Sequence, residues 1–372
     1  MSEVAYFYSR DSLAHDPPPV QVDVGGRKLA LGGRFVSNPL LTEQTHDVLV
    51  AAGLVAQMEP VDPEPAEEDL LYEVHDVDYL EMLHEACMET RTDLGLWVSP
   101  ATWRAATLMA GAAGRAAELV LGGDFQRALI NTRPGGHHAT RNEAMGSCYL
   151  NELACAAAAA RRAGAERVMI VDWDVHTGNG TEKIFWDRAD VMALSIHQES
   201  WYPENSGRAE MVGGPGAEGR TVNVPLPAAT NDAGYQAALT RVVAPLAREF
   251  APDLIILGAG QDPSFYDPQG RMLVSMDGFR EMTRMVRELS DEVCAGRLVC
   301  ALQGGYAPVY GPLCALRVVE GVLAIETDVA DPYHGETEWL VTQRPAAEDA
   351  LDAIDAVLRA QAPHWPSLTQ AR

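Results

Sequence analysis

The sequence predicts an α/β fold in which helices flank a largely parallel central sheet. After about residue 125, short apolar runs, polar or glycine-rich turns and helical stretches follow one another in a repeated order, which is typical of parallel strands joined by helical crossovers. The 372 residues are 47% hydrophobic and 22% charged, the composition of a globular chain with a substantial core. Because no low-complexity tract or long linker divides the chain, residues 1–372 are expected to form a single domain.

Six apolar runs after that point are the candidate strands. Each leads into a polar or glycine-rich turn, as expected where a buried strand ends. The predicted strands are Arg127–Asn131, Arg167–Val171, Val191–Ile196, Thr221–Val224, Leu254–Leu257 and Leu298–Leu302.

Helical stretches lie between and around these strands. The alanine-rich Ala101–Leu121 predicts a helix in an N-terminal segment that wraps the sheet, and Ala346–Ala360 predicts a terminal helix on the outside. Capping residues delimit the others. These are Asn151–Ala163 closed by Gly164, Asp232–Phe250 capped by Asn231, and Met276–Ala295 after Ser275.

The charge and the chain start exclude several classes of protein. A formal charge of −25 argues against DNA or RNA as a partner, because phosphate binding depends on clustered Lys and Arg. No apolar run approaches the roughly 20 residues of a membrane span. The start MSEVAYFYSRDS has no basic segment followed by an apolar core, so we expect no signal peptide and a cytoplasmic location. The six cysteines form no CxxC pair and are expected to be buried free thiols.

Reactive side chains follow four of the predicted strands. In open α/β sheets, ligands bind beyond the carboxyl ends of the strands, so these side chains should meet at one edge. They are His137 and His138 in TRPGGHHAT, the trio Asp172, Asp174 and His176 in VDWDVHTGNG, Asp262 in GAGQDPSFYDPQG, and Tyr306 in QGGYAP.

The trio in VDWDVHTGNG predicts a metal site. Three ionisable groups are costly to bury, and at a spacing of two in an extended chain they project to one side. Asp174 and His176 are ligand types that zinc accepts, and a catalytic zinc usually has three protein ligands. Asp262 is the best candidate for the third. The alternative for Asp174 and His176 is simple hydrogen bonding at a strand end.

The histidine pair and the tyrosine suggest catalytic groups. Gly135 and Gly136 permit the bend that lets successive histidines face one site. Imidazoles beside a metal-bound water suit general base and general acid work, and Asp172 could fix the tautomer of one ring. The Tyr306 phenol could donate to the oxygen of a tetrahedral intermediate. A surface histidine pair and an ordinary GGY turn are the alternatives.

Taken together and in this order, RPGGHHA, DWDVHTGNGT, SIH, Asp262 followed by Asp267-Pro268, and QGGY resemble the histone deacetylase family. The resemblance runs from about Tyr72 onward, includes the segments Asp267–Met272 and Asp331–His334, and is closest to bacterial class II histone deacetylase-like amidohydrolases. It implies a three-layer arginase/deacetylase fold, a substrate tunnel built from long loops, and zinc-dependent hydrolysis of a linear C–N amide bond.

The resemblance also implies a role for individual residues. It makes Asp174, His176 and Asp262 zinc ligands, His137 and His138 the acid–base pair, and Tyr306 the oxyanion donor. Asp172 and Asn179 would orient the two histidines. A potassium ion would bind Asp172, Ser195 and the backbone oxygens of Asp174, His176 and Ile196, and a second one could lie near Phe185, Arg188 and Val191. Two manganese ions, as in related ureohydrolases, would need carboxylates that the sequence does not supply.

The departures from the family pattern cluster around the tunnel. Gly135, Ser147, Thr177, Gln261, Gln269 and Gln303 stand where Pro, Phe, His, Phe, Leu and Glu are usual. Ser147 and Gln269 would make the tunnel wider and more polar, and Trp201 and Tyr202 could form its opposite wall. The tunnel residues are expected to be Ser147, Trp201, Tyr202, Gln269 and Gly304.

Acyl-lysine is therefore the favoured substrate type, with acetylpolyamines or small aryl amides as the alternative. A metal-retaining binding protein with weakened catalysis is an alternative of another class. The sequence leaves a homo-oligomer open.

Overall fold

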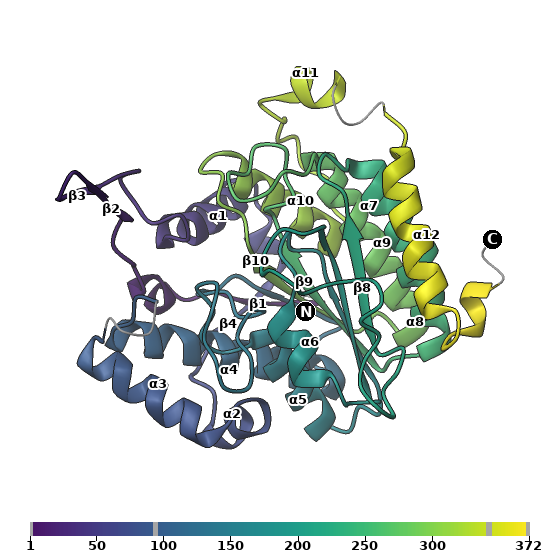
Figure 1. Cartoon of the computed structure of the whole chain (residues 1–372), viewed down its shortest axis with the longest axis horizontal. Helices are drawn as coiled ribbons and strands as arrows, with labels where there is room; N and C mark the ends of the chain where they lie inside the picture. The colour runs from purple at the N-terminus through teal and green to yellow at the C-terminus, as the bar shows by residue number, and fades with distance from the viewer. Residues whose placement is uncertain (1–2, 92–95, 340–343, 370–372) are drawn as a thin grey trace.

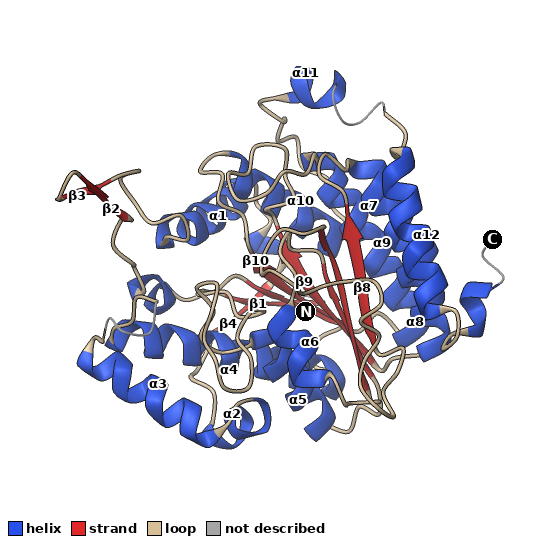
Figure 2. Ribbon diagram, viewed as in Figure 1, coloured by secondary structure: helices blue, strands red, loops and turns tan. Residues whose placement is uncertain are grey.

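An eight-stranded sheet forms the centre of the molecule (Figures 1 and 2). The computed structural model describes residues 3–91, 96–339 and 344–369. Neighbouring strands in the order β4-β1-β5-β10-β9-β6-β7-β8 all pair in parallel, which confirms the predicted fold class. The strands are β1 (Val4–Phe7), β4 (Glu59–Val61), β5 (Arg127–Ile130), β6 (Val168–Asp172), β7 (Val191–Gln198), β8 (Thr221–Leu226), β9 (Leu254–Gly260) and β10 (Leu298–Gln303).

Helices cover both faces of the sheet, and each face has its own hydrophobic core. Alternate residues of one strand serve the two cores: Met169 and Val171 of β6 face one, and Val168 and Ile170 face the other. One face packs against α1 (Pro39–Ala51), α7 (Asp232–Ala238), α8 (Ala244–Phe250), α9 (Met276–Cys294), α10 (Tyr310–Leu323) and α12 (Glu348–Gln361). The other packs against α2 (Glu68–Val74), α3 (Val77–Glu89), α4 (Pro100–Gly122), α5 (Glu152–Arg162) and α6 (Asn179–Phe185).

All six predicted strands are present, but the N-terminal segment does more than wrap the sheet. It supplies β1, which lies between β4 and β5, and the edge strand β4. β1 is only four residues long, and all four are buried. So short an apolar run has no distinctive periodicity, and its place is fixed by pairing with β5, more than a hundred residues later.

The predicted helix over Asp232–Phe250 is interrupted. A π-helical turn, η3 (Leu239–Val243), separates α7 from α8, which has Pro245 in its first turn. Proline has no N–H to donate, and its ring clashes with the carbonyl four residues earlier. A wider turn before Pro245 accommodates the ring without ending the helix.

Smaller elements complete the described chain. They are the helical turns η1 (Arg10–Ala14), η2 (Val55–Gln57), α11 (His334–Thr337) and η5 (Pro366–Thr369), and the hairpin β2 (Gln21–Val24) and β3 (Arg27–Ala30). The hairpin projects from the body of the molecule (Figures 1 and 2). The six cysteines are free and buried, as predicted. Among the described helices, none combines the length and the apolar character needed to cross a bilayer. The single-domain organisation stays a prediction.

Candidate active site and metal centre

The four strands that carry reactive residues are consecutive in the sheet. β5, β10, β9 and β6 lie side by side and run in parallel, so the loops that leave their carboxyl ends meet at one edge. Residues from these loops, including His137, His138, Asp174 and Tyr306, line one cavity. The structure therefore brings together the side chains that the sequence placed at separate strand ends.

Asp174, His176 and Asp262 form a buried cluster in which one potential ligand atom from each residue lies within 4.8 Å of the others. Nδ1 of His176 lies 2.9 Å from Oδ1 of Asp174 and 3.2 Å from Oδ2 of Asp262. Oδ2 of Asp262 is buried and has no hydrogen bond from any described residue. Apart from the ion-pair contact with His176, this carboxylate oxygen is orphaned, which is costly, and a cation at this point would satisfy it.

The segment that carries this cluster is not simply an extended strand. β6 ends at Asp172, and beyond it each acidic side chain holds the backbone two residues on. Oδ1 of Asp172 accepts a hydrogen bond from the Asp174 N–H, and Oδ1 of Asp174 accepts one from the His176 N–H, each at 3.0 Å. The three side chains therefore recur at every second residue, as the sequence predicted. They do so in a loop held by these side-chain-to-backbone hydrogen bonds, and not in a strand.

Gly304 leaves the space that the two carboxylates occupy. It has a φ of +35°, and a Cβ at this position would lie 2.7 Å from Oδ2 of Asp262 and closer still to Oδ2 of Asp174. Two carboxylates and an imidazole are a ligand set that zinc accepts. The donor chemistry, the orphaned oxygen and the glycine cradle together fit a divalent metal such as zinc.

The charges of the cluster also favour a cation. Burial alone would lower the pKa of His176, but Asp174 and Asp262 raise it to about 10. Burial raises the pKa of Asp262 well above its usual value, and the Asp174 charge adds to this effect. The cluster thus draws positive charge between its carboxylates, which a divalent metal would supply.

His137 is held by Asp172. Its Nδ1 lies 2.8 Å from Oδ2 of Asp172, and Gln303 donates to the other oxygen of the same carboxylate at 2.9 Å. Burial would lower the pKa of His137, but the Asp174 and Asp172 charges raise it to about 9. The surrounding carboxylates therefore favour the doubly protonated, positively charged form of this imidazole in the metal-free chain.

His138 is in the opposite state. Its Nδ1 lies 2.7 Å from Oδ1 of Asn179, an acceptor, so Nδ1 carries the proton and Nε2 is left with its lone pair. Burial lowers the pKa of His138 well below its usual value, and the positive charges of His137 and His176 add to the effect. The Tyr202 ring meets this imidazole edge-on at 5.0 Å. His138 is therefore a neutral ring with a free acceptor.

Tyr306 is positioned through its backbone. The Tyr306 and Ala307 N–H groups donate to Oδ2 of the buried Asp267 at 2.6 and 3.2 Å. Burial raises the pKa of the Tyr306 phenol well above its usual value, and the Asp262 and Asp174 charges raise it further. The phenol therefore keeps its proton and can donate it in a hydrogen bond.

Comparison with known proteins agrees with this arrangement. The sequence pattern of the histone deacetylase domain matches residues 36–322. The chain belongs to the histone deacetylase family. A histone deacetylase-like amidohydrolase of Pseudomonas aeruginosa is 36% identical over 351 residues, which cover 92% of this chain and 91% of the relative. The match begins well before Tyr72, where the recognisable motifs begin.

Two further relatives extend the comparison. The human polyamine deacetylase HDAC10 is 34% identical over 320 residues, which cover 82% of this chain and 46% of the relative. The crystal structure of the HDA15 HD domain superposes with a TM-score of 0.86 at 29% identity, covering 100% of this chain and 97% of that one. The predicted histone deacetylase fold is thereby confirmed, and the chain is an amidohydrolase of this family.

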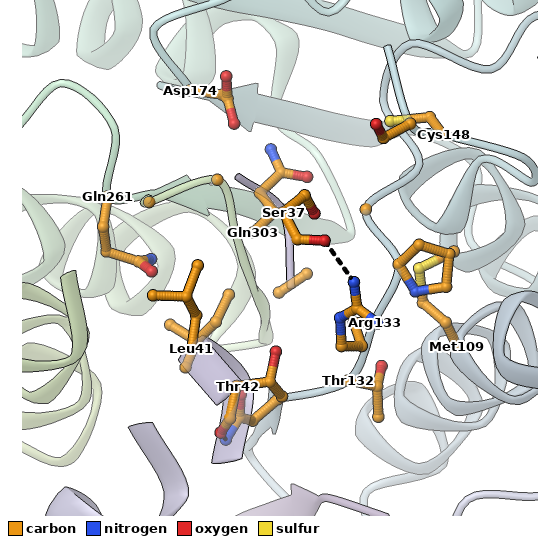
Figure 3. A pocket seen from close by; sticks show the side chains of 18 of the residues that line it. Ser37, Leu41, Thr42, Met109, Thr132, Arg133, Cys148, Asp174, Gln261 and Gln303 are labelled. Atoms are coloured by element: carbon orange, nitrogen blue, oxygen red, sulfur yellow. Dashed lines mark hydrogen bonds between the residues drawn. The ribbon is translucent and has the colours of Figure 1, made fainter. Parts of the chain in front are cut away.

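In this histone deacetylase-family chain, the cavity beside the histidines has a volume of about 90 Å³. Ser147 and Gly304 line it, as does Gln261, whereas Trp201, Tyr202 and Gln269 are not among its lining residues. Figure 3 shows Arg133 among the side chains around the cavity, with its guanidinium donating to the Ser37 carbonyl at 2.8 Å. Of the five expected tunnel residues, Ser147 and Gly304 therefore line this cavity, whereas Tyr202 contacts His138 from outside it.

Trp201 and Tyr202 belong to a segment that contacts the site through His138, His176 and Gln269. The Trp201 indole N–H donates to the Gln269 carbonyl at 2.6 Å, and the Tyr202 ring lies edge-on to His176 at 5.9 Å. Thr177 is buried, and its N–H donates to the Tyr202 carbonyl at 3.1 Å. The backbone of Thr177 therefore links this aromatic segment to the ligand loop, whichever side chain stands at the position.

Glu152 is a site residue that sequence reasoning missed. Its side chain is buried at the start of α5, lines the cavity, and has an Oε2 without a hydrogen bond from any described residue. Burial raises its pKa to about 7, although the His137 charge acts in the opposite direction. An acidic residue in the first turn of a helix is usually an exposed side chain that interacts favourably with the helix dipole. The local sequence therefore does not reveal that Glu152 is buried.

The residues of the expected potassium site lie together. Ser195 pairs with Asp172 across β6 and β7, its hydroxyl lies 2.9 Å from Nδ1 of His197, and Ile196 follows it in β7. Both potassium sites stay predictions, as do Phe185, Arg188 and Val191 as ligands of the second.

Proposed function

We propose that this chain is a zinc-dependent amidohydrolase that cleaves a linear C–N amide bond, with acyl-lysine as the favoured substrate type. The observation that carries the proposal is the buried cluster of Asp174, His176 and Asp262, which lies beside two histidines held in opposite protonation states. The family relationship supports the reaction class. A bound zinc would polarise the amide carbonyl and lower the pKa of a water molecule.

His138 is the general base in this proposal. Its Nδ1 proton is held by Asn179, so Nε2 can accept a proton from the attacking water. The protonated His138 can then pass that proton to the leaving amine. The water is thereby divided between the two products. Its hydroxyl forms a C–O bond to the acyl carbon as the C–N bond breaks, and its proton goes to the leaving amine.

His137 and Tyr306 stabilise charge. His137 is protonated beside Asp172 and is proposed to offset the negative charge that develops in the transition state. The Tyr306 phenol keeps its proton and is proposed to donate a hydrogen bond to the oxygen of the tetrahedral intermediate. Asp172 and Asn179 act by orienting the two imidazoles.

Acetylpolyamines are the second candidate substrate. The net charge of −25 favours cationic molecules, and a hollow on the Thr177 side is lined by Glu199, Glu204 and Glu210. The relative named a polyamine deacetylase is consistent with this choice. Small aryl amides remain the third candidate, and a potassium ion at Asp172 and Ser195 is proposed as a structural cofactor.

A substrate panel tests the proposal. The zinc-loaded protein is assayed with acetyl-lysine peptides, acetylated polyamines and acyl anilides, and metal content is measured on the same sample. We expect turnover of acetyl-lysine peptides with about one zinc per chain. Zinc binding without turnover of any substrate would instead favour the metal-retaining binding protein.

A Tyr306→Phe variant tests the oxyanion role. Loss of one donor of this kind costs roughly 100- to 1,000-fold in kcat, while zinc affinity should stay unchanged because the phenol is not a proposed ligand. A variant as active as the parent would show that the role assigned to Tyr306 is wrong.

A further inference from the structure

A second feature of the chain is unrelated to catalysis: an exposed two-stranded arm, residues 20–31. β2 and β3 pair in antiparallel register, with Val22 opposite Leu29 and Asp23 opposite Lys28. The two-residue turn is Gly25-Gly26, with φ values of +60° and +80°, as tight hairpin turns require. Every residue of the arm is exposed.

The two faces of the arm differ sharply in polarity. Directly opposed and alternate residues share a face. One face therefore carries Arg27, opposite Val24, and five large apolar side chains that are 39–54% exposed: Val20, Val22, Val24, Leu29 and Leu31. The other face carries Gln21, Asp23, Lys28 and Ala30. This is the pattern of a strand pair with one buried face, yet nothing in the described chain buries it.

An uncovered arm of this kind would be unstable. An isolated two-stranded hairpin is marginal in water, and a contiguous exposed apolar face marks an interaction surface. The arm projects away from the body of the molecule (Figures 1 and 2). No described residue of this copy covers its apolar face, which leaves that face available to another molecule.

The charge of the arm indicates its partner. Arg27 and Lys28 against the single Asp23 make the arm a cationic segment of a chain with a net charge of −25. Neither Arg27 nor Lys28 forms an ion pair with any described residue. Cations beside an apolar face favour a surface that is acidic and apolar at once.

The face formed by α2 and α3 has this character. Residues 64–89 contain ten Asp or Glu and no Lys or Arg, and all ten acids are exposed. Among them lie the exposed apolar side chains of Tyr72, Val77 and Met88. Tyr72, Val77 and Met82 also line a surface hollow of about 610 Å³.

We propose that the arm docks its apolar face onto the α2–α3 face of a second copy of this chain, and that the second copy returns the contact. The arm and α3 lie on the same side of the molecule (Figure 1), so one two-fold axis can make both contacts at once. Reciprocal docking doubles the buried area, toward the roughly 800 Å² per partner of a stable interface. The proposal is independent of the proposed hydrolase function.

The mass of the full chain in solution tests the proposal. We expect the parent at ~10 μM to sediment as a dimer of the 40.2 kDa chain, with a dissociation constant that rises with salt. A Val22→Asp/Leu29→Asp variant should be monomeric. The matched control Gln21→Asp/Ala30→Asp adds the same charges to the opposite face of the arm and should stay dimeric.

The acceptor face is tested separately. Tyr72→Ser/Val77→Ser should weaken the dimer at least tenfold, whereas Val309→Ser, at a more exposed apolar position elsewhere, should not. Circular dichroism checks that each variant is folded, and Arg27→Glu offers a second, single-site disruption of the arm. A monomeric parent, equal effects of the two arm variants, or a dimer that ignores Tyr72→Ser/Val77→Ser would each overturn the proposal.

Discussion

Replacing Gly304 by alanine should weaken metal binding without unfolding the protein. An added Cβ would lie 2.7 Å from Oδ2 of Asp262, whereas ordinary contact begins at 3.4 Å. The carboxylate would therefore have to move by about 0.7 Å, several times the ±0.2 Å that metal–ligand distances tolerate. Because changes to residues that only support ligands already cost 10- to 100-fold in affinity, zinc affinity should fall at least ~100-fold.

Backbone strain must be separated from the clash with the ligands. Gly304 has a positive φ, so alanine there also costs roughly 1–2 kcal/mol of stability. Gly123 is the matched control, because it has a φ of +80° and an added Cβ would meet nothing within 4 Å. Gly123→Ala should therefore carry the strain and leave zinc affinity unchanged.

The assay is zinc competition against a chromophoric chelator, with thermal unfolding of the metal-free proteins as the fold control. We expect similar unfolding temperatures for the two variants and weak zinc binding only for Gly304→Ala. If Gly304→Ala bound zinc as tightly as the parent, the assignment of the Asp174 and Asp262 carboxylates to the metal would be refuted.

Three further predictions concern residues around the cluster. Asn179→Ala should lower kcat roughly 10- to 100-fold with zinc content unchanged, because nothing then holds the His138 proton on Nδ1. An unaltered kcat would contradict the orienting role of Asn179. Asp267→Ala should lower kcat and spare zinc affinity, since it frees the Tyr306 backbone; equal loss of zinc would point to collapse of the ligand loop. Glu152 has a pKa of about 7 in the folded chain and a lower pKa, about 4.5, in the unfolded chain. The free energy of unfolding should therefore fall as the pH rises from about 4.5 to 7, by roughly 3 kcal/mol in all. Above pH 7 the folded chain has lost this proton too, and the contribution no longer changes. In denaturant unfolding of the metal-free proteins, Glu152→Gln should be more stable than the parent at pH 8 but not at pH 5. A stability difference between variant and parent that does not depend on pH would refute the burial argument.

The sequence was sufficient for six of the eight strands of the sheet and for the reactive residues at its active edge. Apolar runs such as Val168–Asp172 and Leu254–Gly260 are recognisable locally, because a strand buried on both faces must be continuously apolar. Parallel strands end at one edge, so the order of strands and reactive residues along the chain is enough to group Asp174, Asp262 and Tyr306. The motifs around them then indicate the family.

Other features depend on contacts between residues far apart in the chain. β1 is a strand only because it pairs with β5 and β4, and Trp201 reaches Gln269 across 68 residues. Glu152 has the sequence context of an ordinary first-turn acid, and it is the packing of Gly136 against α5 that buries it. Local sequence reports side-chain chemistry and periodicity, whereas burial, and with it the charge state of Glu152, His137 and His138, is set by the whole fold. The sequence by itself thus determined which groups this protein brings to its active edge, and the tertiary structure decided how each is held and charged.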